Sequence, residues 1–121
     1  LIQHDGIRAQ LAEMRMLIDA SRSYIHRACW LADNQEHGWD KTLGALPKAM
    51  ASQAAWKIAT WTLEMHGGHG YMKEFGVAKL VRDAAAFLHS DGVNRTLFLK
   101  ASNFMYDMPD YGQTEMPKAA E

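Results

Sequence analysis

The chain has 121 residues, which is enough for one compact domain with a core but small for a complete enzyme that holds a large cofactor. Thirteen Lys and Arg residues balance fourteen Asp and Glu residues, and the formal net charge of -1 excludes a long-range attraction to nucleic acid or to an anionic membrane. No apolar run approaches the roughly 20 residues that span a bilayer, and the first residues lack the regions of a signal peptide. We therefore expect a soluble single domain whose partners are selected by contact.

The first residue and the single cysteine add two expectations. The chain begins with Leu1 rather than Met, which indicates a fragment or a processed product. Cys29 cannot form an internal disulfide, and we expect it to be a small buried thiol within a helix. A reducing compartment fits this cysteine, either a bacterial cytoplasm or a mitochondrial matrix.

Two long helices are predicted in the first half of the chain. Apolar residues recur at helical spacing and predict a helix from about residue 5 to residue 33; they are Ile7, Leu11, Met14, Leu17, Ile18, Ile25 and Leu31. Turn-forming residues around His37 and Gly38 predict a short loop between antiparallel helices. The second helix is predicted from Leu43 to Met65, with Pro47 tolerated near its first turn and small residues such as Ala49 and Ser52 permitting close packing.

Glycines end the second helix, and two shorter helices follow. Gly67, Gly68 and Gly70 predict a loop, because each glycine within a helix costs about 1 kcal/mol relative to alanine. Helices are predicted at 77–88 and 93–106, separated by the break Ser90-Asp91-Gly92. Prolines and glycine in residues 109–121 predict an extended or disordered tail beyond a helical unit at 1–108. The apolar stripes and short loop predict an all-α, up-and-down bundle.

Three separated motifs carry a resemblance to a known family. The stretch from Glu64 through Gly67-Gly-His-Gly-Tyr71 to Glu74 is followed by Arg82-Asp-Ala84 and then by Asp91-Gly92. In this order and spacing they resemble the "GGxGY", "RDA" and "EGT" motifs of the C-terminal domain of acyl-CoA dehydrogenases. Leu11-Ala-Glu-Met14 and Lys48-Ala-Met-Ala-Ser52 are similar to two further helices of that domain, so the resemblance covers most of residues 1–108.

The resemblance implies a fold, an activity and partners. It implies the family's C-terminal helical bundle without its first helix, and without the N-terminal helical and middle β domains. The implied reaction is the α,β-dehydrogenation of an acyl-CoA thioester to a 2,3-enoyl-CoA, with FAD as hydride acceptor and an electron-transferring flavoprotein as the next acceptor. A bundle without its first helix would keep an apolar groove, so we expect a dimer, a tetramer or a complex with the rest of the same enzyme.

The same resemblance places the candidate cofactor contacts. Gly67, Gly68 and Gly70 correspond to a loop that lies against the FAD of a neighbouring subunit, and glycines let main-chain N–H groups approach a cofactor closely. An ordinary helix C-cap and turn would have the same glycines. Glu64 stands where the family commonly has a glutamine, and Val93 and Arg95 replace polar residues after the catalytic turn. A carboxylate accepts but does not donate hydrogen bonds, and phosphates repel it.

Asp91 is the candidate catalytic residue. It occupies the place of the glutamate that removes the α-proton in most members of the family, and aspartate has the same chemistry with one methylene less reach. The competing interpretation is that Asp91 caps the helix that follows. The histidines 37, 66, 69 and 89 show no HExxH or cysteine-rich spacing, so no metal site is expected.

Two hypotheses of different classes follow. In the first, the chain is part of an FAD-dependent acyl-CoA dehydrogenase and is inactive alone. In the second, it is a non-catalytic helical subunit or oligomerisation module of a heteromeric dehydrogenase, as the replacements at Glu64, Val93 and Arg95 favour.

Overall fold

The computed structural model describes residues 1–35 and 40–107. Helices dominate these ranges and no strand occurs in them, which confirms the all-α prediction. The centre of the loop predicted around His37 and Gly38, and the tail predicted at 109–121, lie outside the described residues.

The first long helix, α1, spans Asp5–Asp33, which agrees with the predicted bounds. Asp5 lies in its first turn, where a carboxylate is favoured by the positive end of the helix dipole. The helix ends at Asn34, whose backbone N and side-chain Nδ2 both donate to the carbonyl of Trp30, at 3.0 Å and 2.8 Å. These two bonds close the last turn in place of a continuing helix.

The second predicted helix is divided into two elements. A 3₁₀ helix, η2, spans Lys41–Gly44, and the long helix α2 spans Leu46–His66, so the predicted start at Leu43 was wrong. Pro47 explains the difference, because proline has no N–H to donate and is favoured only in the first turn of a helix. Asp40 begins η2 by accepting hydrogen bonds from the Thr42 hydroxyl at 2.6 Å and backbone N at 2.9 Å, which lower the pKa of Asp40.

The glycine segment is a loop only in part. Gly67 ends α2 with a φ of 54°, but a single helical turn, α3, follows at Gly68–Tyr71, and a 3₁₀ helix, η3, at Lys73–Phe75. The loop prediction was therefore wrong for Gly68 and Gly70. Glycine is disfavoured in long helices, but one turn costs little, and Gly70 is held by packing against the end of α2.

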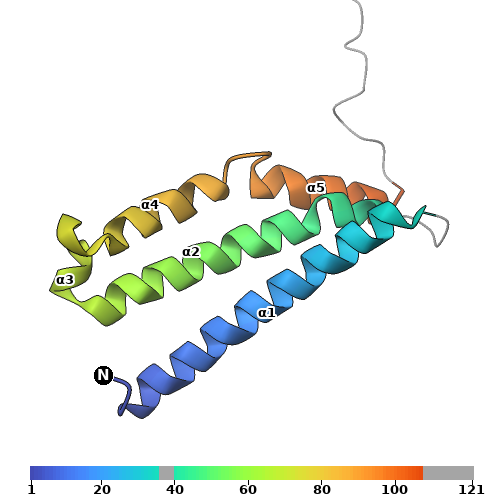
Figure 1. The fold of residues 1–121 in the computed structure, drawn as a ribbon. Coiled ribbons are helices and arrows are strands. Elements are labelled where there is room, and N and C mark those ends of the chain that lie inside the picture. The colour runs from blue at the N-terminus through green and yellow to red at the C-terminus, as the bar shows by residue number, and fades with distance from the viewer. Residues whose placement is uncertain (36–39, 108–121) are drawn as a thin grey trace, which may run out of the picture.

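The last two helices match their predictions closely. Helix α4 spans Val77–Phe87 and helix α5 spans Asn94–Met105. Figure 1 shows α1 and α2 antiparallel, with α4 beside α2 on the side away from α1. Helix α5 packs across η2 and the first turns of α2. Helix α2 is thus the central element, and the candidate site residues lie on it, at its end, in elements packed against it or in the turn that joins α4 to α5.

Small side chains form the core where α5 meets α2. The buried cluster consists of Ala45, Ala49, Leu97 and Ala101, and Ala49 has no exposed surface. Alanine and serine on α2 therefore allow the close helix contacts that the sequence predicted. Lys57 of α2 forms an ion pair with Glu13 of α1, with 2.7 Å between Nζ and Oε1, and so links the two long helices. The same Nζ lies 4.4 Å from the centroid of the Trp61 ring.

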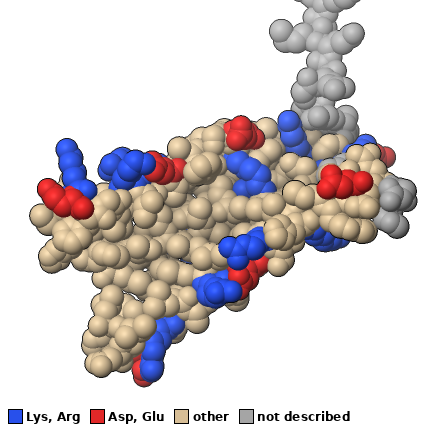
Figure 2. Space-filling model, viewed as in Figure 1, with Lys and Arg blue, Asp and Glu red and all other residues tan. Residues whose placement is uncertain are grey.

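Much of the apolar surface remains uncovered. In the α1 stripe Met14 is buried, but Leu11, Ile18 and Ile25 are 40%, 39% and 38% exposed. No large side chain in the described residues is fully buried. Figure 2, in the view of Figure 1, shows a broad surface of residues other than Lys, Arg, Asp and Glu, with these charged residues scattered over it and at its margins. Exposed apolar area of this kind marks a surface that contacts other protein.

Candidate functional site

Asp91 lies in a tight turn between α4 and α5. Its φ is 52°, in the left-handed region that non-glycine residues rarely adopt, and Gly92 follows with a φ of 101°. The turn is closed by a hydrogen bond from the Asn94 backbone N to the Leu88 carbonyl at 3.2 Å. A side chain at Gly92 would also crowd Leu97, whose Cδ2 lies 3.1 Å from the Cβ position. Asp91 is therefore held in a strained conformation and is exposed.

The interpretation of Asp91 as a helix cap is wrong. Helix α5 begins at Asn94, its N-cap residue is Val93, and no side chain caps it. Asp91 precedes the N-cap by two residues, and its backbone is left-handed rather than extended as a cap residue requires. Capping thus does not explain the aspartate at this position.

Asp91 borders an apolar cavity of about 440 Å³. The cavity is formed by α1, η2 and α2 together with the end of α4 and the turn. Its polar lining includes the side chains of Asp91, Lys48 and Ser52, and its less polar lining is Ile25, Ala28, Cys29, Leu43, Pro47, Ala51, Ala55 and Phe87. Cys29 is exposed, so the prediction of a buried thiol was wrong. A carboxylate at the rim of an apolar space suits a ligand with an apolar part and an acidic C–H.

A polar network joins α2 to the turn that carries Asp91. The Lys48 ammonium donates to the Gly92 carbonyl at 2.7 Å and to Asn94 Oδ1 at 2.9 Å. Asn94 Nδ2 donates to Ser52 Oγ at 2.8 Å, and Ser52 Oγ lies 3.1 Å from the Ala49 carbonyl that it can donate to. Ser52 and Asn94 are buried. The sequence had singled out Lys48 only for its resemblance to a helix motif, and Ser52 for that resemblance and as a small residue that permits close packing. Contacts between residues 42 to 46 positions apart could not be predicted from spacing.

The three candidate glycines differ in what surrounds them. Gly70 is buried, and a Cβ there would lie 2.7 Å from the Leu63 carbonyl oxygen, so the fold itself requires glycine at this position. Gly67 needs its positive φ but has open space at its Cβ position. Gly68 is exposed, has an ordinary φ, and also has nothing within 4 Å of a Cβ. Gly67 and Gly68 therefore present open backbone surface that a cofactor could approach.

The candidate residues fall into two groups at different ends of α2. Exposed Glu64 and the glycines lie at its C-terminal end, whereas Asp91, Val93 and Arg95 lie opposite Lys48 and Ser52 (Figure 1). The helical rise of about 1.5 Å per residue separates Ser52 from Glu64 by about 18 Å. Val93 and Arg95 are both exposed. The structure therefore does not bring the six candidate cofactor residues together.

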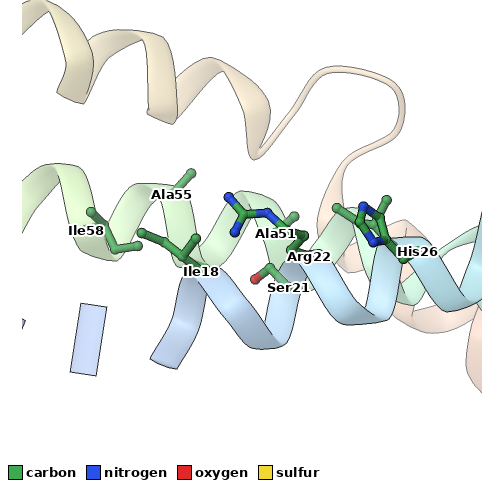
Figure 3. A pocket seen from close by; sticks show the side chains of 9 residues that line it. Ile18, Ser21, Arg22, His26, Ala51, Ala55 and Ile58 are labelled. Atoms are coloured by element: carbon green, nitrogen blue, oxygen red, sulfur yellow. The ribbon is translucent and has the colours of Figure 1, made fainter. Parts of the chain in front are cut away.

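A second groove lies between α1 and α2. It has a volume of about 370 Å³, and Figure 3 shows its lining from α1, including Ile18, Ser21 and Arg22, beside Ala51, Ala55 and Ile58 of α2. The Ser21 hydroxyl is buried there and makes no hydrogen bond within the described residues. This groove corresponds to the uncovered part of the α1 stripe.

The histidines of the glycine segment contact neighbouring groups of the chain. His66 Nδ1 lies 2.8 Å from the Thr62 carbonyl, and the His69 ring packs edge-on against Phe75 at 5.1 Å. In residues 1–35 and 40–107 no three His, Cys, Asp or Glu side chains are grouped so that they could hold a metal ion, and His37 lies outside these ranges. None of the helices described is long and apolar enough to cross a membrane.

Fold and site together define a helical domain with two features: a carboxylate beside an apolar cavity, and an open glycine turn at the C-terminal end of α2. Residues 1–100 match the family model described as acyl-CoA dehydrogenase, C-terminal domain, and the chain belongs to the acyl-CoA dehydrogenase family. FAD is the general cofactor of this family.

Similar proteins support the same assignment. The chain is 35% identical over 89 residues to the probable acyl-CoA dehydrogenase YngJ of Bacillus subtilis, a match that covers 74% of this chain and 23% of that protein. It is 33% identical over 95 residues to cyclohexane-1-carbonyl-CoA dehydrogenase of Geobacter metallireducens and to a short-chain-specific acyl-CoA dehydrogenase of Megasphaera elsdenii, and each match covers 78% of this chain and 24% of the relative. The chain thus spans about a quarter of the length of these relatives.

Proposed function

We propose that this chain forms one wall of the active site of an FAD-dependent acyl-CoA dehydrogenase that converts an acyl-CoA thioester to a 2,3-enoyl-CoA. The observation that carries the proposal is Asp91, an exposed carboxylate held at a φ of 52° at the rim of the apolar cavity. Aspartate is among the few non-glycine residues that tolerate the left-handed region, so this turn can present a carboxylate beside the cavity. All three relatives described above carry the names of acyl-CoA or carbonyl-CoA dehydrogenases.

Asp91 is the base in this proposal. Its carboxylate takes the α-proton of the thioester, and bound FAD would supply the acceptor for the hydride that leaves the β-carbon. The apolar cavity beside Asp91 receives the part of the acyl group nearest the reacting carbons, and a bound substrate would cover the exposed carboxylate. The aspartate side chain is one methylene shorter than that of a glutamate, so it must approach the α-carbon more closely.

The cofactor contacts are proposed for Gly67 and Gly68 rather than for Gly70. The first two have open space at the Cβ position, whereas the space at Gly70 is filled by the chain itself. Ser52, which contacts Asn94 beside the Asp91 turn, is separated from Gly67 by about 22 Å at a helical rise of about 1.5 Å per residue. This separation favours contact of the glycines with a different flavin from the one served by Asp91. We therefore propose a homo-oligomer, a dimer or a tetramer, in which the glycine turn contacts the FAD of a neighbouring subunit.

The uncovered surface of α1 and α2 supports this assembly. Leu11, Ile18 and Ile25 stay partly exposed along one helix, and the groove beside them is apolar. Other protein, from the rest of the same enzyme or from a second subunit, would cover them. An electron-transferring flavoprotein is the proposed next electron acceptor.

A non-catalytic helical subunit is the competing proposal. Glu64, Val93 and Arg95 favour it, because none of the three can donate and accept hydrogen bonds as the polar residues of active relatives do. Reduction of the flavin separates the two proposals. The complete enzyme is mixed with a straight-chain acyl-CoA without oxygen, and flavin absorbance and enoyl-CoA formation are followed together. Bleaching with one enoyl-CoA per flavin supports the enzyme, and a flavin-free protein or an unchanged spectrum supports the non-catalytic subunit.

A further inference from the structure

The turn that carries Asp91 is fixed at its two ends by backbone hydrogen bonds, from Ser90 N to the Ala86 carbonyl at 2.9 Å and from Asn94 N to the Leu88 carbonyl at 3.2 Å. Residues 89–93 are exposed, and two successive residues, Asp91 and Gly92, have positive φ angles. A short exposed turn with this backbone would relax among several conformations if only its ends were fixed. Catalysis by a short carboxylate tolerates little relaxation, because misplacement by about 1 Å costs up to about 100-fold in rate.

Lys48 adds a restraint within the turn, between its two ends. Its ammonium donates to the Gly92 carbonyl at 2.7 Å, one residue beyond Asp91, and to Asn94 Oδ1 at 2.9 Å. Both bonds are charge-assisted and so stronger than bonds between neutral groups. Lys48 also lines the cavity that Asp91 borders, so the same side chain contacts the turn and forms part of the site wall.

Ser52 fixes the orientation of the amide through which Lys48 acts. Asn94 Nδ2 donates to Ser52 Oγ at 2.8 Å, which leaves Oδ1 turned toward the ammonium at 2.9 Å. The reversed amide would place two N–H groups against a cation, which is unfavourable. Ser52 and Asn94 are buried, and Ser52 Oγ also lies 3.1 Å from both Asn94 Oδ1 and the Ala49 carbonyl, so these polar groups satisfy one another away from water.

The network is not needed to attach α5 to the bundle. The apolar cluster Ala45, Ala49, Leu97 and Ala101, with Leu46, already holds α5 against α2. Both hydrogen bonds of the Lys48 ammonium end on the turn or on Asn94, the first residue of α5. Lys48 therefore restrains the turn more than it holds the helix. We infer that Lys48, through Gly92 and Asn94, is a positioning residue that sets the location of the Asp91 carboxylate for proton abstraction.

The inference rests on the proposed function, and a double-mutant cycle in the complete FAD-loaded enzyme tests it. The variants are Lys48→Met, Asp91→Asn and the two combined, and the measured quantity is the rate of flavin reduction at saturating acyl-CoA. Lys48→Met should slow reduction by about 10- to 100-fold with unchanged flavin content and little change in apparent substrate affinity. In the Asp91→Asn background the same change should slow it by less than about 2-fold, because there is no base left to position.

Matched variants separate positioning from loosening of the fold. Lys57→Met removes another half-buried lysine of α2, with its pair to Glu13 at 2.7 Å, but no contact to the turn. It should lower thermal stability and leave the reduction rate near wild type. Lys48→Arg keeps the charge and the donors, so it should recover much of the rate lost in Lys48→Met. If Lys48→Met does not fold, Ser52→Ala replaces it in the cycle, with an expected loss of about 3- to 10-fold.

Each result has a definite meaning. The positioning role is overturned if Lys48→Met and Lys57→Met slow flavin reduction equally. It is also overturned if Lys48→Met slows flavin reduction as much in the Asp91→Asn background as in the wild type. A wild-type rate in Lys48→Met while Asp91→Asn is slow also overturns it, and leaves the proposed function intact. A wild-type rate in Asp91→Asn alone instead removes Asp91 as the base, and so rejects the proposed function itself.

Discussion

Gly70 gives the sharpest test of the packing at the end of α2. A Cβ at this position would lie 2.7 Å from the Leu63 carbonyl oxygen and 3.0 Å from His66 Cβ, and the first contact is with backbone that cannot turn aside. Overpacking of this kind costs about 1–3 kcal/mol, whereas alanine in a helical turn gains up to about 1 kcal/mol over glycine. We expect Gly70→Ala to lower the free energy of unfolding by about 1–2 kcal/mol, measured by denaturant unfolding of the chain.

Gly68→Ala is the matched control two residues earlier. Gly68 is exposed, has an ordinary φ, and has nothing within 4 Å of a Cβ. Alanine there should leave stability unchanged or raise it by up to about 1 kcal/mol. In the complete enzyme the same change should weaken FAD retention, since we propose that Gly68 faces the cofactor. Equal unfolding free energies for the two variants would refute the packing argument.

Three further predictions concern the turn, the start of η2 and the assembly. Asp91→Gly relieves a left-handed φ of 52° and should stabilise the chain by up to about 1 kcal/mol; a loss of stability would reveal an unrecognised contact of the carboxylate. Asp40→Ala should cost about 0.5 kcal/mol near neutral pH, since Asp40 is exposed. The Thr42 hydrogen bonds lower the pKa of Asp40 below its ordinary 3.8, so this stabilisation is present above pH 3.8 and is lost as the pH falls through the lower pKa of the folded state. The free energies of unfolding of the wild type and Asp40→Ala should therefore become equal in acid. The uncovered α1 surface predicts sedimentation as a multimer at micromolar concentration, and a compact monomer would contradict this.

The helices were predictable because their signals are local. The apolar spacing along α1 gave both of its ends, and the break at Ser90-Asp91-Gly92 separated α4 from α5. The start of α2 was missed, since the effect of Pro47 was taken as tolerated rather than as setting the first turn. The glycine segment was missed in part because Gly70 depends on Leu63, a contact that a propensity argument does not contain.

The candidate site was less accessible to sequence reasoning. The Asp-Gly pair indicated a turn, but not that Asp91 itself would take the left-handed conformation and precede the cap by two residues. Lys48 and Asn94 are 46 residues apart, and only the packing of α5 on α2 brings them together. Cys29 was expected to be buried, yet the open bundle leaves it exposed beside the cavity. Long-range contacts and incomplete burial follow from tertiary packing, which local periodicity does not specify.

The central claim is that Asp91 removes the α-proton of the substrate. Asp91→Asn tests it most directly, because asparagine has nearly the same size and accepts a left-handed φ but cannot take the proton. The rate of flavin reduction by a saturating acyl-CoA is measured in the complete enzyme under anaerobic conditions, beside flavin content and thermal stability. We predict a rate at least about 100-fold below wild type with flavin content and stability unchanged. A variant that reduces its flavin at the wild-type rate would contradict the claim.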